Sequence, residues 1–102
     1  MTEGYQSAAP LQDVPDGGTL AVEVGGVPIV LVRRGSRVTA LENRCPHAGA
    51  PLSEGFVEGD RITCSWHGWT FELDGGRCPD DPSACVPTYD VRIEDGMVLV
   101  RV

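Results

Sequence analysis

Short apolar or alternating runs, separated by glycine-containing turns, recur along the whole chain. No segment keeps apolar residues at a helical period, whereas several runs alternate as strands do. The pattern therefore predicts an all-β protein.

Glycine turns indicate where the expected strands reverse. The run "TLAVEVGG" leads through Gly25-Gly26 into "VPIVLVRR", and Arg34-Gly35-Ser36 separates expected strands at Ile29–Val32 and Arg37–Leu41. Glycine beside an acidic residue suits the positive backbone φ of tight turns. Further hairpins are therefore expected at three such places: Glu58-Gly59-Asp60, Asp74-Gly75 and Asp95-Gly96.

The stretch "CPDDPSACVP", residues 78–87, contains three prolines and no periodicity, so it is expected to be a loop. The chain shows no repeat, low-complexity tract or linker that would mark a second domain. At 102 residues and 10.9 kDa, with 41% hydrophobic residues, it is expected to form one domain, residues 1–102.

Charge and composition narrow the functional classes. The net charge of -7 argues against nucleic acid as a partner, although it could steer encounters with a basic protein surface. Neither a signal-like start nor a long apolar run is present, so a soluble, cytoplasmic protein without membrane association is expected. Four cysteines in such a protein favour metal or redox chemistry over a disulfide framework.

Both histidines of the chain stand close to a cysteine, in the pairs Cys45–His47 and Cys64–His67. The intervening segment holds the hairpin expected at 58–60, which could bring the two pairs side by side as metal ligands. Zinc fingers usually join cysteine to cysteine and place the histidines on a helix, and neither feature is found here. A structural zinc site in the same four residues stays open as an alternative, because Cys2His2 is a legitimate zinc set.

The order of these residues resembles the Rieske 2Fe-2S motif. The resemblance rests on "CPHAG" from Cys45 and "CSWHG" from Cys64, and it extends from about Thr19 through "APLSEG" and "ACVPTYDVRIEDG". Small Rieske ferredoxins and the small subunits of assimilatory nitrite reductases share these features. The resemblance implies a small β-sandwich with an inserted cluster-binding subdomain at about 41–77, and one cluster per chain. Its ligands would be Cys45 and Cys64 on one iron, and His47 and His67 on the other.

The resemblance also implies a low reduction potential. High-potential Rieske proteins add a disulfide between the loops and hydroxyl groups that donate to the cluster, but here Ala50, Trp69 and Phe71 stand near those positions. Backbone amides around Gly49, Ala50 and Gly68 are the expected remaining donors. A potential on the order of -150 mV, at the low end of the Rieske range, is expected.

The implied function is electron transfer, not catalysis by this chain alone. With both histidines used by the cluster, no 2-His-1-carboxylate oxygenase iron site can be formed. The expected role is a one-electron ferredoxin, monomeric in isolation, between an NADH-dependent flavin reductase and a terminal oxygenase. A small electron-transfer subunit of a nitrite-reductase-like complex, and a structural zinc module, are the alternatives.

Two further pairs of residues carry expectations. Trp69 is expected to pack in the core of the cluster subdomain, and Trp66 to offer a contact surface. Cys78 and Cys85 are not assigned to the cluster, because their spacing matches neither ligand pair. A disulfide between them is possible by spacing, but a buried free Cys85 and an unremarkable Cys78 are expected in a cytosolic protein.

Overall fold

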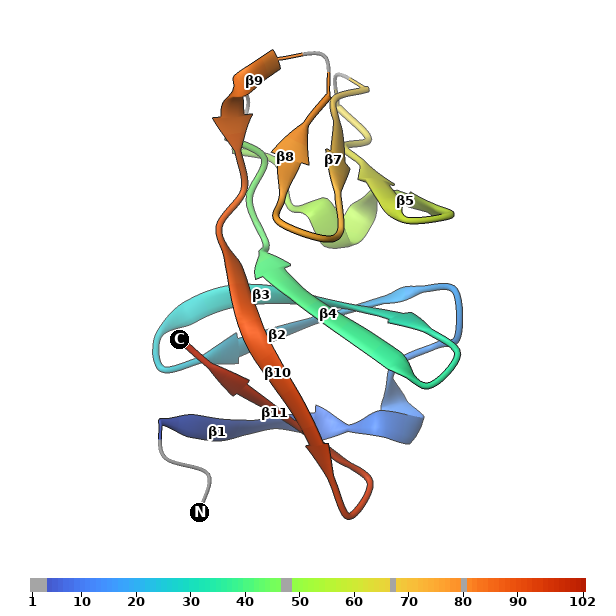
Figure 1. Cartoon of the computed structure of the whole chain (residues 1–102), viewed down its shortest axis with the longest axis vertical. Helices are drawn as coiled ribbons and strands as arrows, with labels where there is room; N and C mark the ends of the chain where they lie inside the picture. The colour runs from blue at the N-terminus through green and yellow to red at the C-terminus, as the bar shows by residue number, and fades with distance from the viewer. Residues whose placement is uncertain (1–3, 47–48, 67, 80) are drawn as a thin grey trace.

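The computed structural model describes residues 4–46, 49–66, 68–79 and 81–102 (Figure 1). Within these ranges the chain forms β-strands and two single 3-10 turns, and the prediction of an all-β protein is confirmed. No helix in the described part is long and apolar enough to cross a membrane. The elements are β1 (Tyr5–Pro10), η1 (Leu11–Asp13), β2 (Thr19–Val24), β3 (Val27–Arg34), β4 (Arg37–Glu42), η2 (Leu52–Glu54), β5 (Phe56–Glu58), β6 (Arg61–Thr63), β7 (Thr70–Glu72), β8 (Arg77–Cys78), β9 (Asp81–Cys85), β10 (Thr88–Glu94) and β11 (Met97–Arg101).

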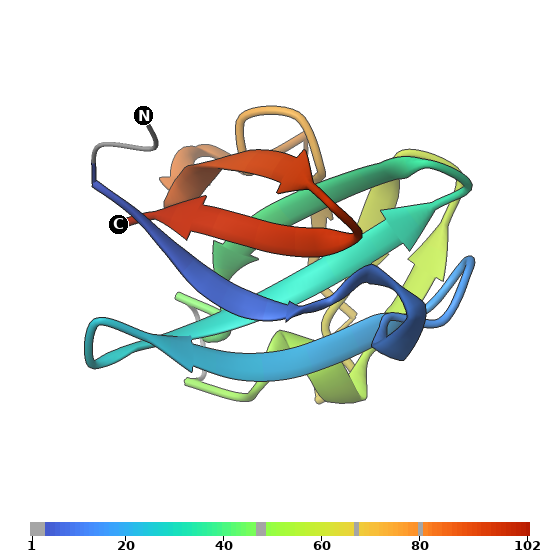
Figure 2. The ribbon, with the colours of Figure 1, turned by 90° about the horizontal axis from the view of Figure 1, so that it is seen from below.

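Six antiparallel strands form the larger sheet, in the order β1-β11-β10-β4-β3-β2. The sheet folds over, so that β1 at one end of this order contacts β2 at the other (Figure 2). Apolar side chains fill the space enclosed by the sheet and form the lower core. Its buried members are Ala9, Val14, Val24, Ile29, Leu31, Val38, Ala40, Val98 and Val100.

The remaining strands form a smaller unit at one end of the long axis (Figure 1). One sheet has the order β5-β6-β7, and β8 pairs with β9. A separate upper core lies between this unit and the larger sheet. Its buried members are Val30, Val32, Leu41, Cys45, Ala50, Leu52, Ile62, Cys64, Phe71, Leu73, Cys78 and Val86.

Strand β3 connects the two cores. Ile29 and Leu31 belong to the lower core, whereas Val30 and Val32 belong to the upper core, and all four are fully buried. Alternate side chains of a strand point to opposite faces of its sheet. A strand covered on both faces needs a continuous apolar run, which explains the sequence "IVLV".

Four of the expected hairpins are present, but the turn at Asp74-Gly75 joins β7 to β8 without pairing them, since β7 pairs with β6 and β8 pairs with β9. Gly25 and Gly26, between β2 and β3, both have positive φ, as do Asp95 (52°) and Gly96 (75°) between β10 and β11. Two consecutive positive φ values are the requirement of a tight type I′ hairpin turn. The turns at 34–36 and 58–60 likewise join β3 to β4 and β5 to β6.

Two segments differ from expectation. Residues 78–87 were expected to be a loop, yet β9 lies within them and pairs with β8, and the N–H of Val86 donates to the carbonyl of Gly76 at 2.8 Å. A proline in this strand is compatible with β9 pairing on one side only, since an edge strand leaves half of its N–H groups outside the ladder. The other segment is β1, for which the sequence pattern predicted no strand.

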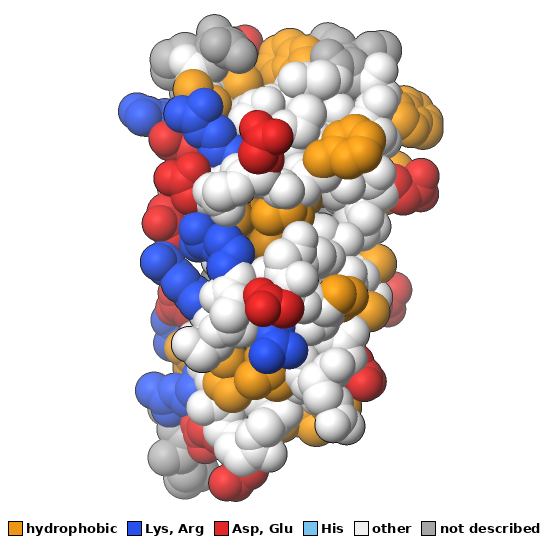
Figure 3. Space-filling model, turned by 90° about the vertical axis from the view of Figure 1, so that its right-hand side faces the viewer, with side chains coloured by type: hydrophobic (Ala, Val, Ile, Leu, Met, Phe, Trp, Pro, Cys, Tyr) orange, Lys and Arg blue, Asp and Glu red, His pale blue; other side chains and the backbone are white. Residues whose placement is uncertain are grey.

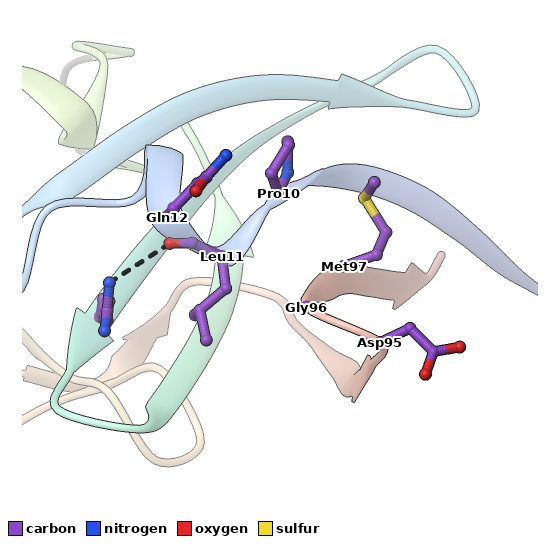
Figure 4. A pocket seen from close by; sticks show the side chains of 7 residues that line it. Pro10, Leu11, Gln12, Asp95, Gly96 and Met97 are labelled. Carbon is purple, nitrogen blue, oxygen red and sulfur yellow. Dashed lines mark hydrogen bonds between the residues drawn. The ribbon is translucent and has the colours of Figure 1, made fainter.

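A hollow of the described surface lies beside the turn between β10 and β11 (Figure 4). It measures about 480 Å³ and is bordered by η1 and by the β10–β11 turn. Arg33 is one of the residues that line it, and its Nη1 donates to the carbonyls of Leu11 and Val14 at 3.3 and 3.2 Å. None of its lining residues comes from the segments that carry the Cys–His pairs.

Candidate iron–sulfur site

The two segments that carry the Cys–His pairs have matching backbone hydrogen bonds. In the first, the N–H of Cys45 donates to the carbonyl of Ala50 at 2.8 Å, and the N–H of Gly49 donates to the carbonyl of Cys45 at 2.7 Å. In the second, Cys64 and Trp69 form the equivalent 2.7 Å bond, and Gly68 donates back to Cys64 at 3.0 Å. Each cysteine therefore opens a loop of six residues closed by the same two bonds. We call residues 45–50 and 64–69 the cluster loops.

The glycine at the fifth position makes this loop shape possible. Gly49 and Gly68 both have a φ of 72°, in the left-handed region that residues with a Cβ adopt at a cost. The repeated signal is Cys-x-x-x-Gly, which the sequence shows beside the more conspicuous histidines. The Cys–His pairs were evident from the sequence, but this backbone repeat was missed.

The structure brings both predicted cysteine ligands into the upper core. Cys45 and Cys64 are each 1% exposed and are members of the same hydrophobic cluster. His47 and His67 lie outside the described residues. The described residues alone contain no group of three metal-binding side chains, so the cysteines are the described half of the predicted set.

A polar clamp holds the base of the first cluster loop. The side-chain amide of Asn43 donates to Oγ of Ser53 at 3.0 Å, and the N–H of Ser53 donates to Oδ1 of Asn43 at 2.8 Å. The N–H of Asn43 also donates to the carbonyl of Pro28 in β3, and Thr19 of β2 donates to the Ser53 carbonyl. The clamp thus ties both ends of the loop to the larger sheet. Sequence reasoning missed Asn43 and Ser53, because their ten-residue separation matches no local capping or turn motif.

The base of the second cluster loop is held by β6 and β7. Thr63 and Thr70 are opposite each other in the antiparallel register, and their hydroxyl oxygens lie 3.1 Å apart in a hydrogen bond. Gly55, just after η2, packs directly against the carbonyl of Thr63. The residues on either side of the loop are therefore fixed, which favours a site that changes little between oxidation states.

Ala50 provides a test of whether a cluster fits. Ala50 is fully buried, and its backbone N–H has no acceptor among the residues that the structure describes. A buried N–H without an acceptor is costly unless a bound group accepts from it, as a cluster sulfur can. The two cysteine thiols in the same core are the soft ligands that iron–sulfur clusters require.

The expected set of amide donors needs a correction. The N–H groups of Gly49 and Gly68 are used to close the cluster loops, since each donates to a cysteine carbonyl. Of the three donors expected from the sequence, only Ala50 keeps an N–H without an acceptor in the described part of the chain.

The aromatic residues near the loops divide as expected. Trp69 is partly buried and packs against the upper core, and Phe71 is fully buried within it. Trp66, in contrast, is 60% exposed. Phe56 on the edge strand β5 is a second exposed aromatic residue, which was not singled out from the sequence.

The expectation for the two remaining cysteines was wrong in one respect. Cys78 is a buried free thiol of the upper core, whereas Cys85, expected to be buried, is exposed. Cys78 lies on β8 with its side chain in the upper core, while Cys85 is the last residue of the edge strand β9. The free thiol of Cys78 also shows that the two residues form no disulfide.

Charged groups lie on the surface, where arginines and carboxylates stand side by side along one edge (Figure 3). Arg77 pairs with Glu72 at 3.2 Å, and Arg37 pairs with Asp74 at 2.6 Å. Both arginines and Asp74 are exposed to solvent, and Glu72 is half-buried. Such pairs contribute little to stability. Tyr89 on β10 is the described group with a shifted pKa, because burial, and secondarily the charge of Glu42, raise the pKa of its hydroxyl.

Two buried thiols on matching loops of an all-β molecule indicate a metal-binding protein. The family comparison specifies the class: the Rieske [2Fe-2S] domain model matches residues 4–90, and the chain belongs to this family. Its cofactor is therefore a Rieske-type 2Fe-2S cluster. The match begins at residue 4, well before Thr19, where the sequence resemblance was expected to begin, and it includes β1.

Several proteins resemble the chain over nearly its whole length. The ferredoxin component of naphthalene 1,2-dioxygenase/salicylate 5-hydroxylase systems from a Ralstonia species is 34% identical over 102 residues, covering 99% of this chain and 98% of its own. The ferredoxin of carbazole 1,9a-dioxygenase from Nocardioides aromaticivorans superposes with a TM-score of 0.88 at 29% identity, covering 94% and 95% of the two chains. A protein described as an NADH-dependent nitrite reductase small subunit from Mycobacterium tuberculosis gives 0.87 at 28% identity, covering 94% and 92%.

Proposed function

We propose that this protein is a one-electron carrier that passes electrons from an NADH-dependent flavin reductase to a terminal oxygenase. The observation that carries the proposal is the pair of matching cluster loops, which hold Cys45 and Cys64 in the upper core. The likeness to ferredoxin components of dioxygenase systems over almost the full chain supports the same role. An electron carrier needs a rigid cluster near its surface and no substrate pocket beside it.

We propose Cys45 and Cys64 as ligands of one iron, and His47 and His67 as ligands of the other. Support comes from the burial of both thiols and from the histidines' places within the same two six-residue loops. When bound, the cluster accepts and releases a single electron. The chain's own contribution is to hold the thiolates, to exclude water around them and to offer the N–H of Ala50.

The reduction potential is proposed to lie near the low end of the Rieske range, on the order of -150 mV. Ala50 and Phe71 carry no hydroxyl and are fully buried, and Trp69 packs against the same core. Fewer hydrogen bonds to the cluster stabilise its reduced, more negative form less. A redox titration with a clearly positive midpoint would contradict this part of the proposal.

Residues 1–102 are proposed to form one Rieske domain, with the cluster-binding subdomain at about 41–77. Support comes from the upper core, which contains Leu41, Cys45, Cys64 and Leu73. The protein is further proposed to be monomeric in isolation and cytoplasmic.

The proposed function can be tested with purified protein and three measurements. The expected results are two irons and two acid-labile sulfides per chain, and an anisotropic Rieske EPR signal after reduction by dithionite. NADH-dependent reduction of cytochrome c should then require this protein when a flavin reductase of an aromatic-dioxygenase system is supplied. Cys45→Ser should lose the EPR signal, whereas Cys85→Ser should keep it. A colourless wild-type protein with one zinc per chain would refute the proposal.

A permanent subunit of a nitrite-reductase-like complex is the second candidate, favoured by the 0.87 TM-score to the M. tuberculosis protein. The two roles differ in the lifetime of the partner complex, since a shuttle must dissociate between donor and acceptor. Purification from native cells under mild conditions separates them. A free monomer supports the shuttle, and stable association with a large flavin- or haem-containing subunit supports the permanent subunit.

A further inference from the structure

The cluster loops contain no arginine, lysine or carboxylate, and Arg44 directly precedes the first of them. In residues 44–50 and 64–69, taken together, Arg44 is the one arginine, and no lysine or carboxylate is present. The protein as a whole has a net charge of -7. Residues 44–50 and 64–69 therefore carry a positive charge, opposite in sign to the net charge of the whole molecule.

Arg44 is held against the first cluster loop. The backbone N–H of Arg44 donates to the carbonyl of Glu42 at 2.8 Å. The neighbouring residues are also fixed, Asn43 by the polar clamp and Cys45 by the closure of the loop. A Cβ atom placed on Gly49 would lie 3.9 Å from Nε of Arg44. The guanidinium group thus lies beside Gly49 of the first cluster loop.

Among the described residues, no carboxylate forms an ion pair with Arg44. Four other arginines form ion pairs, and Arg33 donates to backbone carbonyls. Arg44 is exposed and has no ion pair within the described ranges. Its positive charge is therefore available to both the cluster and an approaching partner.

We propose that the positive charge of Arg44 assists electron transfer in two ways. It stabilises the reduced cluster, and it attracts an anionic group of the electron acceptor to the cluster loops. The proposal rests on the proposed function of the protein. With neutral histidines, two ferric ions, two sulfides and two thiolates sum to zero charge, so one-electron reduction leaves a single negative charge. A cation beside the loop lowers the energy of that state. The docking preference is opposite to the one expected from the net charge, which favoured a basic partner surface.

Ferricyanide is a suitable anionic probe of this preference. It takes one electron from the reduced cluster and becomes ferrocyanide, with no proton transferred and no bond formed. Hexaammineruthenium(III) accepts one electron in the same way but is a cation. The two probes therefore report the sign of the charge at the place where the electron leaves.

The test compares Arg44→Gln, Arg44→Lys and the control Arg61→Gln in the cluster-loaded protein. Arg61 on β6 is also exposed and forms no ion pair in the described part, so its replacement removes the same charge away from the loops. At low ionic strength, Arg44→Gln should slow stopped-flow reoxidation by ferricyanide about fivefold, accelerate reoxidation by hexaammineruthenium, and approach wild type in high salt. The midpoint potential of Arg44→Gln should be more negative than those of wild type and Arg61→Gln. Arg44→Lys, which keeps the positive charge, should retain the wild-type potential and the wild-type reoxidation rates.

Equal ferricyanide rates for wild type and Arg44→Gln, or an equal loss in Arg61→Gln, would overturn the inference. Both outcomes are distinct from failure of the proposed function, in which the wild-type protein would show no reducible cluster at all. Iron and sulfide content, measured for each variant first, ensures that the rates refer to an intact site.

Discussion

Replacement of Gly55 by alanine tests how closely the packing beneath the second cluster loop is specified. The φ of Gly55 is -88°, which any residue adopts, so its backbone does not require glycine. The atoms around Gly55, however, leave no room for a side chain. A Cβ at this position would lie 2.0 Å from the carbonyl oxygen of Thr63 and 3.2 Å from that of Leu52. Both atoms belong to the backbone, so side-chain rotation cannot relieve the overlap.

The size of the effect follows from this geometry. Overpacking of a dense core costs about 1–3 kcal/mol, and a clash of the added Cβ with backbone oxygens belongs at the upper end, about 3 kcal/mol. A domain of this size loses roughly 4–8 °C in Tm per kcal/mol, so Gly55→Ala should lower Tm by roughly 12–24 °C. Because Thr63 directly precedes Cys64, cluster occupancy should fall as well.

Gly59→Ala is the matched control. Gly59 has a φ of 60°, and a Cβ added there would meet no atom within 4 Å, so the substitution adds backbone strain without a clash. Its cost should be about 1 kcal/mol, or roughly 4–8 °C in Tm. The assay is thermal unfolding of cluster-loaded protein at one scan rate, followed by far-UV circular dichroism and by the visible absorbance of the cluster. A Tm for Gly55→Ala equal to or above that of Gly59→Ala would refute the steric reasoning.

Three further predictions concern the aromatic and thiol groups around the upper unit. Trp69→Ala should lower the free energy of unfolding by about 2–3 kcal/mol, since this ring packs against the upper core. Trp66→Ala should leave Tm nearly unchanged and lower turnover with the partner proteins, because its side chain is exposed. Equal losses of Tm in the two variants would contradict this division. Iodoacetamide should alkylate Cys85 in the folded, loaded protein and Cys78 only after unfolding, as peptide mass spectrometry can show; early labelling of Cys78 would be inconsistent with its burial. The raised pKa of Tyr89 means that the folded state holds the phenolic proton more tightly than the unfolded state does. The contribution of Tyr89 to stability is therefore complete below the unfolded pKa of 10.0, and it is lost as pH rises through the folded pKa. Urea unfolding from about pH 9 to about pH 11 should therefore show a smaller decline for Tyr89→Phe than for wild type, and parallel declines would argue against it.

The proposed ligands and the turns could be read from the sequence because their signals are local. Cys45 and Cys64 are recognised by residue type and spacing, and the turn at Asp95-Gly96 by the positive φ that it needs. The strand β1 was not predictable in this way, since "YQSAAP" has a weak pattern and is held by pairing with β11, the last strand of the chain. For the same reason β9 was taken for a loop: its ladder to β8 outweighs the unfavourable propensity of a proline-containing segment.

By itself, the sequence determined the all-β class, four of the hairpins and the residue types of the proposed ligand set. These depend on the period of a strand, on turn conformation and on the properties of sulfur and imidazole, all of which act within a few residues. Only the tertiary structure decided that Asn43 clamps Ser53, that Gly55 must lack a side chain and that Cys78 is buried while Cys85 is exposed. Those features arise where segments distant along the chain meet at van der Waals distance, and no local pattern encodes such a meeting.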